Sequence, residues 1–168
     1  MNPVRVVRRI SPAFVLLLAG LLLGGCTVYN KAVISGRKAG QSRIETAEKT
    51  REMFNCKDLR RNYLFLEKTE VFPENVPPGQ KINHRLKYAL CPSKKTKTLR
   101  GVLTRRILYK GASIFRDRGR HEFNPGGWMV DAFITIPPKA EEGMYAVETV
   151  IEYEGKTLRD RASFFVKK

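Results

Sequence analysis

The clearest pattern in this sequence is a regular alternation of apolar and polar side chains over residues 128–168. Every second residue from Trp128 to Ile136 is apolar, and two prolines end this run. A second run of this kind spans 145–151, and a turn signal separates it from a final strand over 162–166. A period of two places alternate side chains on one buried face of a strand. This part of the chain therefore predicts three short strands.

The segment from residue 56 to residue 127 is also strand-like. Apolar or branched runs begin at Tyr63, Ile82 and Leu99, with signals for loops or turns between them. Several short strands separated by turns at this spacing are typical of a β-sandwich. We therefore predict an all-β fold, an antiparallel β-sandwich of about seven strands over residues 56–168.

Three stretches near the C-terminus resemble bacterial immunoglobulin-like and fibronectin type III-like modules. They are Trp128-x-Val-x-Ala-x-Ile-x-Ile-Pro-Pro, Ala140-x-x-Gly-x-Tyr-x-Val and Gly155-Lys156. The resemblance covers roughly residues 60–168 and implies an immunoglobulin-like sandwich in which Tyr145 packs at a corner. Antibody domains carry a Cys on each of two facing core strands, whereas Cys56 precedes the first strand here. Trp128 and Tyr145 are interpreted as core side chains, and an aromatic platform for carbohydrate is the alternative.

The first 26 residues carry a different signature. Arg5, Arg8 and Arg9 precede an almost wholly apolar run over 13–23, which leads into Leu23-Gly24-Gly25-Cys26. A basic start, a short apolar region and small residues before a cleavage point define a secretory signal, whereas a spanning helix needs about 20 apolar residues. The Leu-Gly-Gly-Cys stretch resembles the lipobox of bacterial lipoproteins. The resemblance implies that residues 1–25 are a signal peptide and that Cys26 is the lipid attachment site. A buried apolar helix with a chance cysteine is the alternative.

The expected anchor also implies a location. Two or three acyl chains, such as palmitate, hold a protein stably on a membrane. In Gram-negative lipoproteins an Asp after the lipidated Cys tends to retain the protein at the inner membrane, and here the next residue is Thr27. The resemblance therefore implies an outer-membrane lipoprotein whose domain faces the periplasm.

Residues 26–55 are expected to join this anchor to the sandwich. The stretch 27–41 is polar, shows no clear period and is interpreted as a flexible tether. Ser42 and Glu45 have the Ser-x-x-Glu spacing of a capping box, and neither Pro nor Gly interrupts 42–54. A short helix over 42–54 is therefore predicted, acting as a spacer or, alternatively, binding a partner.

Two cysteines remain after Cys26 is assigned to the lipid. Cys56 and Cys91 form an even pair in a chain expected to be exported, which predicts a disulfide. The alternative is two free thiols, one of them pairing between chains. These cysteines and the distant His84 and His121 lack the spacing of metal ligands, so neither a metal nor another cofactor is expected.

Positive charge is concentrated in one segment. The whole chain has 32 basic and 16 acidic side chains, a net charge of +16; residues 1–25 hold three of the basic ones and no acid, so the mature chain carries +13. Residues 81–120 alone hold 13 basic side chains and one acid, Asp117. The members predicted to form an anion-binding patch are Lys94, Lys95, Lys97, Arg100, Arg105, Arg106, Arg116, Arg118 and Arg120.

Such a patch raises the local concentration of anions. The candidate partners are an anionic polymer, a lipid head group or an acidic protein. The sequence contains no nucleic-acid-binding motif, which argues against DNA or RNA. The alternative is a solvated basic surface without a specific ligand.

The sequence contains no nucleophile elbow, P-loop or zinc signature. We therefore expect a non-catalytic binding or scaffolding module, anchored to a membrane, whose basic segment 81–120 contacts an anionic envelope partner. The alternative is a structural accessory subunit of an outer-membrane or envelope protein assembly. An unrecognised enzyme is a third hypothesis.

Overall fold

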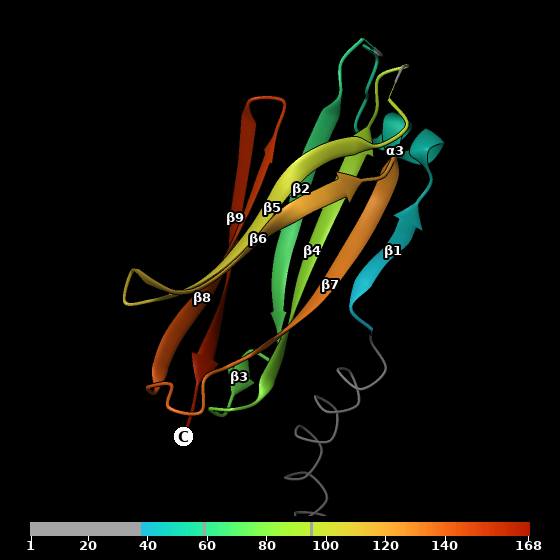
Figure 1. Ribbon diagram of the computed structural model, residues 1–168. Coiled ribbons are helices and arrows are strands. Elements are labelled where there is room, and N and C mark those ends of the chain that lie inside the picture. The colour runs from blue at the N-terminus through green and yellow to red at the C-terminus, as the bar shows by residue number, and fades with distance from the viewer. Residues whose placement is uncertain (1–37, 59, 95) are drawn as a thin grey trace, which may run out of the picture. The chain divides into compact units, whose positions relative to one another are not determined.

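The computed structural model describes residues 38–168 except residues 59 and 95, and these form an all-β sandwich (Figure 1). The signal peptide expected over 1–25, the lipid site Cys26 and most of the tether lie outside the described residues. Among the described residues, no helix is long and apolar enough to cross a membrane.

The described residues form nine strands and one short helix. Their bounds are β1 Gly40–Glu45, α3 Ala47–Met53, β2 Tyr63–Phe72, β3 Asn75–Val76, β4 Lys81–Cys91, β5 Leu99–Tyr109, β6 Ala112–Phe123, β7 Gly126–Thr135, β8 Gly143–Tyr153 and β9 Lys156–Val166. The seven long strands, β2 and β4 to β9, match the number expected from the sequence. The short strands β1 and β3 are additions that no alternation signals.

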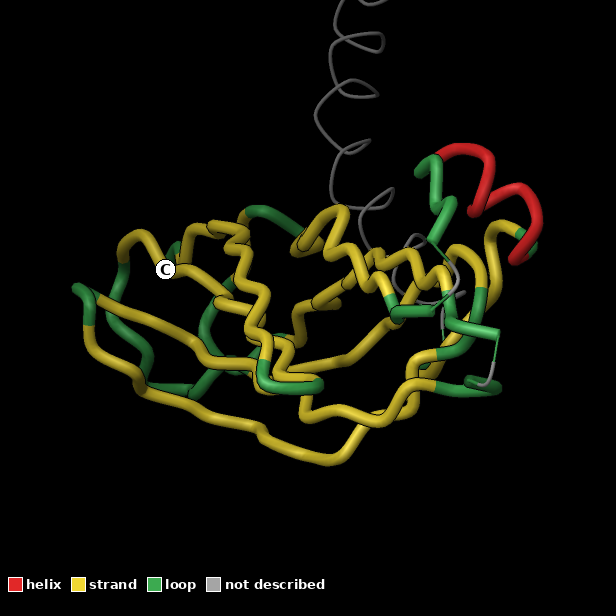
Figure 2. Tube along the Cα trace, turned by 90° about the horizontal axis from the view of Figure 1, so that it is seen from above, coloured by secondary structure: helices red, strands yellow, loops and turns green. Residues whose placement is uncertain are grey.

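The strands pack as two sheets (Figure 2). One sheet has the order β1-β7-β4-β2 and the other has the order β3-β9-β8-β5-β6. Every neighbouring pair is antiparallel except β3 and β9, which run parallel. The prediction of an antiparallel sandwich is therefore confirmed, apart from this two-residue pairing.

Strand β1 corrects the prediction for residues 40–54. Gly40–Glu45 pairs with β7, so the predicted tether and the first turn of the predicted helix are partly sheet. The capping box at Ser42 is not formed. Helix α3 begins one residue after Thr46, whose side-chain oxygen accepts the N–H of Lys49 at 3.3 Å. The sheet thus includes residues that precede residue 56, where sequence analysis placed the start of the sandwich.

The core follows from the alternation within the strands. On β7 the side chains of Val130 and Ile134 are buried, and Trp128 packs against the core while its Nε1 donates to the carbonyl of Pro125 at 2.9 Å. Tyr145 is buried, and its hydroxyl donates to the carbonyl of Glu141, four residues upstream, at 2.9 Å. Tyr145 is therefore a core side chain, and Trp128 is a partly buried side chain packed against the core.

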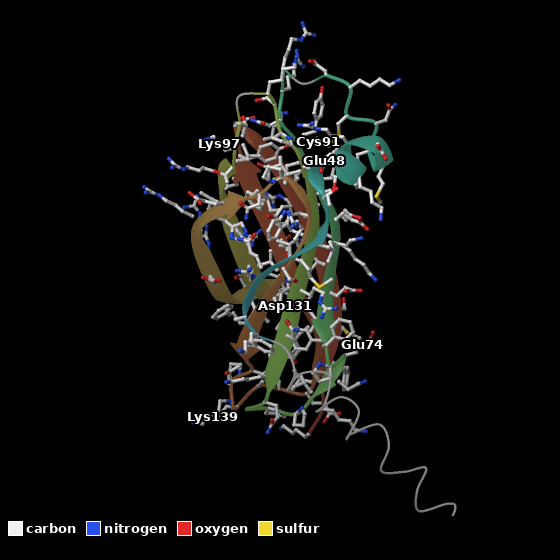
Figure 3. The ribbon with its side chains drawn as sticks, turned by 90° about the vertical axis from the view of Figure 1, so that its right-hand side faces the viewer. Glu48, Glu74, Cys91, Lys97, Asp131 and Lys139 are labelled. Carbon is white, nitrogen blue, oxygen red and sulfur yellow. A yellow bond between two sulfur atoms is a disulfide. The ribbon has the colours of Figure 1, made fainter. Side chains whose placement is uncertain are left out.

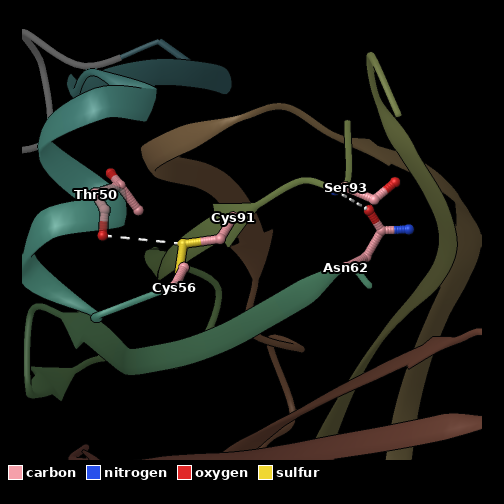
Figure 4. Close-up of a disulfide and its surroundings, with 5 residues drawn as sticks. All are labelled: Thr50, Cys56, Asn62, Cys91 and Ser93. Atoms are coloured by element: carbon pink, nitrogen blue, oxygen red, sulfur yellow. Dashed lines mark hydrogen bonds between the residues drawn. A yellow bond between two sulfur atoms is a disulfide. The ribbon is translucent and has the colours of Figure 1, made fainter. Parts of the chain in front are cut away.

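The Cys56–Cys91 disulfide predicted from the sequence is formed, with 6.3 Å between the two Cα atoms (Figure 4). It joins the segment after α3 to the end of β4. Cys91 Sγ lies 3.9 Å from the carbonyl oxygen of Thr50, which is buried in α3. The bridge therefore holds the helix against the end of the sandwich.

Candidate anion-binding face

A layer of polar side chains crosses the interior of the sandwich and divides its apolar core into two clusters. Its members are Thr69 of β2, His84 of β4, Arg105 of β5, Asp117 of β6, Thr149 of β8 and Asp160 of β9. The strand registers align Arg105 with Asp117 and Thr149, and Thr149 with Asp160, whereas His84 and Thr69 of the other sheet join them through hydrogen bonds.

These polar groups form a continuous chain of hydrogen bonds. Arg105 donates through Nε to His84 Nδ1 at 3.1 Å and through Nη1 to Asp117 at 3.2 Å. Because Nδ1 accepts, His84 carries its proton on Nε2, which donates to Thr149 Oγ1 at 2.9 Å. Thr69 Oγ1 also donates to Thr149 Oγ1, at 3.2 Å. Buried polar groups are thereby paired, as stability requires.

This arrangement corrects the prediction that Arg105 belongs to an exposed patch. Arg105 is only 9% exposed and points into the sandwich. Burial, and then the charge of Arg105, lower the pKa of His84 from 6.5 to about 3. His84 is therefore neutral at physiological pH, and this layer contributes to the fold rather than to an anion-binding surface.

The opposite face of the same sheet points away from the other sheet and is rich in arginine. Side chains alternate between the two faces of a strand, so Arg106 lies on the face opposite to its neighbour Arg105. Cross-strand register places seven arginines and three glutamates on this outer face, which we call the arginine face. They are Arg100 and Arg106 of β5, Arg116, Arg118, Arg120 and Glu122 of β6, Glu148 and Glu152 of β8, and Arg159 and Arg161 of β9.

Glu148 is the fixed centre of the arginine face. It is 2% exposed, and Arg161 donates to its Oε1 through Nε at 2.9 Å and through Nη2 at 2.7 Å. Arg106 donates to its other oxygen from the neighbouring strand. Burial would raise the pKa of Glu148, but the hydrogen bonds from Arg161 and Arg106 outweigh it, so the pKa is lowered. One buried carboxylate thus orders two arginines.

Positive charge remains after these pairings. Arg118 pairs with Glu152 at 3.1 Å and Arg100 with Glu122 at 3.4 Å. Among the described residues, Arg116, Arg120 and Arg159 lie within ion-pair distance of no carboxylate. Within the same part of the chain, the buried Nε of Arg106 has no hydrogen-bond acceptor. The face therefore offers free cations to a bound anion.

Two of the seven arginines were missed by sequence analysis. Arg159 and Arg161 lie on β9, outside the basic segment 81–120, in a region whose total charge is nearly balanced. Their spacing of two residues on a strand was the available signal. Asp160, between them, points inward and accepts the N–H of Thr69 at 2.8 Å. The acids that balance this region are therefore not all on the same face as its arginines.

The remaining predicted patch residues lie elsewhere or outside the described residues. Lys94 and Lys97 are in the loop between β4 and β5, at the same end of the sandwich as Cys91 and opposite Lys139 (Figure 3). Lys95 lies outside the described residues. Arg100 lies where this end meets the arginine face. It lines a hollow of about 570 Å³ together with Arg120 and Glu122.

Other basic residues of the segment are paired on other surfaces. Arg85 contacts Asp131 at 3.2 Å on the outer face of the four-stranded sheet, and Lys87 contacts Glu67 at 3.1 Å. Lys110 contacts Glu141 at 3.1 Å. The basic segment 81–120 therefore does not form one surface: five of its arginines lie on the arginine face, and its other described basic residues lie elsewhere.

The described residues contain no group of His, Cys, Asp and Glu side chains that could hold a metal ion. The chemistry available on the arginine face is the binding of anions through charge-assisted hydrogen bonds. Guanidinium groups suit this task because they remain charged and present several donors in one plane.

No known protein family and no curated protein matches this chain. Parts of several solved structures are similar to it. One is the alkylpurine DNA glycosylase AlkC of Pseudomonas fluorescens, bound to DNA containing an abasic site analogue, with 15% identity, a TM-score of 0.46 and coverage of 62% of this chain and 30% of that chain. A glycosyl hydrolase family 2 member from Bacteroides cellulosilyticus has 18% identity and a TM-score of 0.45 over 61% of this chain and 15% of that chain.

The CARDB domain of the PF1109 protein from Pyrococcus furiosus, in complex with di-metal ions, has 13% identity and a TM-score of 0.39 over 63% of this chain and 87% of that chain. The first two similarities span less than a third of the other proteins' length. With TM-scores below 0.5, these similarities carry no argument about this chain. Its own two packed sheets define a β-sandwich, and its function must be argued from its own residues.

Proposed function

We propose that this chain is a lipid-anchored envelope protein whose immunoglobulin-like sandwich is a non-catalytic binding or scaffolding module for an anionic partner. The lipobox-like stretch before Cys26 supports the anchor, and the residue that follows supports the outer membrane, with the sandwich in the periplasm. The anion is bound on the arginine face. The candidate partners are a polymer, a lipid head group and an acidic protein, and each presents phosphate, sulfate or carboxylate groups.

The observation that carries this proposal is the excess of arginine over glutamate on one ordered sheet face. Isolated surface cations are mobile and their ion pairs contribute little. Here Glu148 fixes Arg106 and Arg161, so the cost of ordering these side chains is met during folding rather than during binding. Arg116, on the strand next to Arg106, adds a free positive charge at the same level. An anion that spans several strands would contact all of these groups.

The proposal is tested by the retention of the full-length chain, purified in non-ionic detergent, on immobilised heparin. The patch variant Arg116→Glu/Arg159→Glu removes two free cations of the arginine face. The control variant Lys81→Glu/Lys139→Glu changes the net charge equally at exposed residues away from that face. We expect the patch variant to elute at clearly lower salt than both the wild type and the control.

Equal shifts for both variants would mean that retention reports net charge and that the arginine face is no site. If the patch variant does elute earlier than the control, vesicles containing an anionic phospholipid separate the sources of the anion. Binding to the vesicles that depends on Arg116 and Arg159 favours a lipid head group, whereas binding to heparin alone favours a polymer.

A second candidate function is a structural accessory subunit of an outer-membrane or envelope protein assembly. Many basic side chains already have carboxylate partners within the chain, including Arg85, Lys87 and Lys110, and this leaves them less available to an anionic partner. Stable co-purification of the lipidated chain with other envelope proteins, unchanged in the patch variant, would favour this role.

A further inference from the structure

Strand β6 is an edge strand with an open side. It is the last strand of the five-stranded sheet, and within the part of the chain that the structure describes only β5 pairs with it. Residues 112–120 are exposed throughout, and the β5–β6 hairpin projects from the sandwich (Figure 1). An edge strand presents a row of main-chain N–H and C=O groups that can pair with another strand.

The common protections of an edge are only partly present on β6. The strand is long, twelve residues, and contains no proline. Its register with β5 is regular from Phe115 to Phe123, and the irregularity lies nearer the hairpin, opposite Ile107 and Leu108. The side chains of Ile114 and Phe115 are 47% and 40% exposed. Geometry therefore permits another strand to pair along 115–120.

Charge decides which strand fits. Arg116, Arg118 and Arg120 lie on the arginine face at every second residue, where they would stand opposite alternate residues of an added strand. A second copy of β6 in antiparallel pairing would place arginines opposite arginines, and like charges directly opposite destabilise a sheet. An acidic residue opposite each arginine stabilises it. The edge is thus protected against self-association and is complementary to an acidic strand.

The inner side of the edge sets a second requirement. Phe115 lies on the inner side of β6, opposite the buried Ile107, yet remains 40% exposed. Asp117 is held by Arg105, so its charge is already compensated. An added strand would therefore place an apolar residue beside Phe115 and small or polar residues farther along, beside Asp117 and Gly119.

We propose that β6 is the docking site for an extended acidic segment of a partner protein, which adds to the five-stranded sheet as a further antiparallel strand. The segment carries acidic residues at alternate positions, opposite Arg116, Arg118 and Arg120, and an apolar residue beside Phe115. This inference rests on the proposed function and names the class of anionic partner. Main-chain hydrogen bonds supply affinity, and the alternating charges supply specificity and direction.

The test uses the full-length chain in non-ionic detergent and a short synthetic probe, acetyl-Thr-Glu-Ser-Glu-Thr-Glu-Val-Thr-amide. Amide hydrogen exchange is followed along the chain with and without the probe. We expect slower exchange within residues 112–120 and little change in β2 or β4. The variant Arg118→Glu replaces an attraction by a repulsion and should lower the affinity for the probe by roughly tenfold. The control Lys139→Glu, at an exposed residue away from the arginine face, should not.

A second probe separates strand addition from simple charge attraction. It keeps the three Glu residues but has proline in place of the Ser and Thr residues between them, so it loses amide donors while its charge is unchanged. We expect it to leave exchange in β6 unaltered. Equal protection by both probes would overturn strand addition. Slow exchange, in the free chain, of the β6 amides that are not bonded to β5 would also overturn it, because the open side of the edge would already be occupied.

The failure of this inference can be told from failure of the proposed function. Heparin retention that depends on Arg116 and Arg159, without any effect of the acidic probe on β6, would sink the strand-addition inference alone. If neither result is obtained, the proposal of an anionic partner fails together with the strand-addition inference.

Discussion

Arg105 and Arg106 are adjacent in the chain, but their environments are opposite. Arg105 is buried between the sheets and bound to His84 and Asp117, whereas Arg106 lies on the outer face and is bound to Glu148. Sequence analysis treated both as patch residues because it assigned no register to β5. The period of two makes at most one of two neighbouring residues available to a given face, so the density of charge along a sequence overestimates the charge of any one surface.

The buried position of Arg105 predicts a large loss of stability when its charge is reversed. In Arg105→Glu a carboxylate replaces the guanidinium in the polar layer and faces Asp117, leaving an uncompensated buried charge. Asp117 is half exposed, but the new carboxylate is buried without a cation, and an uncompensated buried charge costs about 3–5 kcal/mol. The urea midpoint should fall accordingly, while Arg116→Glu, on the exposed edge, should change stability by only about 0.5 kcal/mol. Similar midpoints for both variants would contradict the buried position of Arg105.

His84 predicts a pH dependence of stability. Its pKa is about 3 in the folded chain and 6.5 ordinarily, because of burial and then the charge of Arg105. Below pH 6.5 the unfolded chain therefore takes up a proton that the folded chain does not, so stability falls as the pH decreases towards 3. One such group changes the free energy of unfolding by at most about 1.4 kcal/mol per pH unit.

The measurement is urea unfolding between pH 7 and pH 5, a window above the lowered pKa of Glu148. In His84→Gln we expect lower stability throughout, since the polar layer is disturbed, but a shallower dependence on pH. An unchanged slope in the variant would show that His84 does not carry the effect.

At the scale of elements, the sequence was most informative where one face of a strand is apolar. The alternation from Trp128 to Ile136 corresponds to β7 and its continuation, and Gly143 begins β8. Strand β1 was missed because its side chains are mostly exposed and polar, so burial leaves no pattern in it. The spacing of Ser42 and Glu45 then imitated a capping box, although the residue that caps α3 is Thr46.

The pairing of β1 with β7 predicts that Gly126 does not tolerate a side chain. Gly126 has a positive φ of 100°, and a Cβ atom there would lie 2.5 Å from the carbonyl oxygen of Glu45. Gly126→Ala should therefore be destabilising by more than about 1 kcal/mol, through backbone strain and displacement of the end of β1. Gly119→Ala is the control, since a Cβ atom meets nothing within 4 Å there and φ is not positive. Equal unfolding midpoints for the two variants would contradict the close approach of β1.

At the scale of the whole molecule, the distribution of charge depends on which strands become neighbours. The arginine face combines β5 and β6 with β9, although residues 124–155 lie between β6 and β9 in the sequence. Charge counting along the sequence did not single out Arg159 and Arg161, because nearby acidic residues offset their charge. Some of these acids, such as Asp160, point away from the arginine face. The fold class was thus accessible from local periodicity, whereas the composition of the site required long-range register.

The proposed anchor predicts a clear effect of Cys26→Ser. Serine cannot form the thioether that joins the diacylglyceryl group, so lipidation and processing should be lost, and an uncut or unlipidated form should accumulate. Metabolic labelling with a fatty acid tests this expectation, with Cys56→Ser/Cys91→Ser as the control that keeps the lipid site. Label retained in the Cys26→Ser variant would refute the assignment.

The central claim is that the arginine face, rather than overall net charge, binds an anionic partner. Its most direct test is the slope of log affinity for heparin against log salt concentration. Each cation that neutralises a polyanion charge releases counterions and adds about one unit to this slope. Arg116→Gln/Arg159→Gln should therefore reduce the slope by roughly two units, and Lys81→Gln/Lys139→Gln should leave it unchanged. An equal slope for the two double variants would contradict the claim.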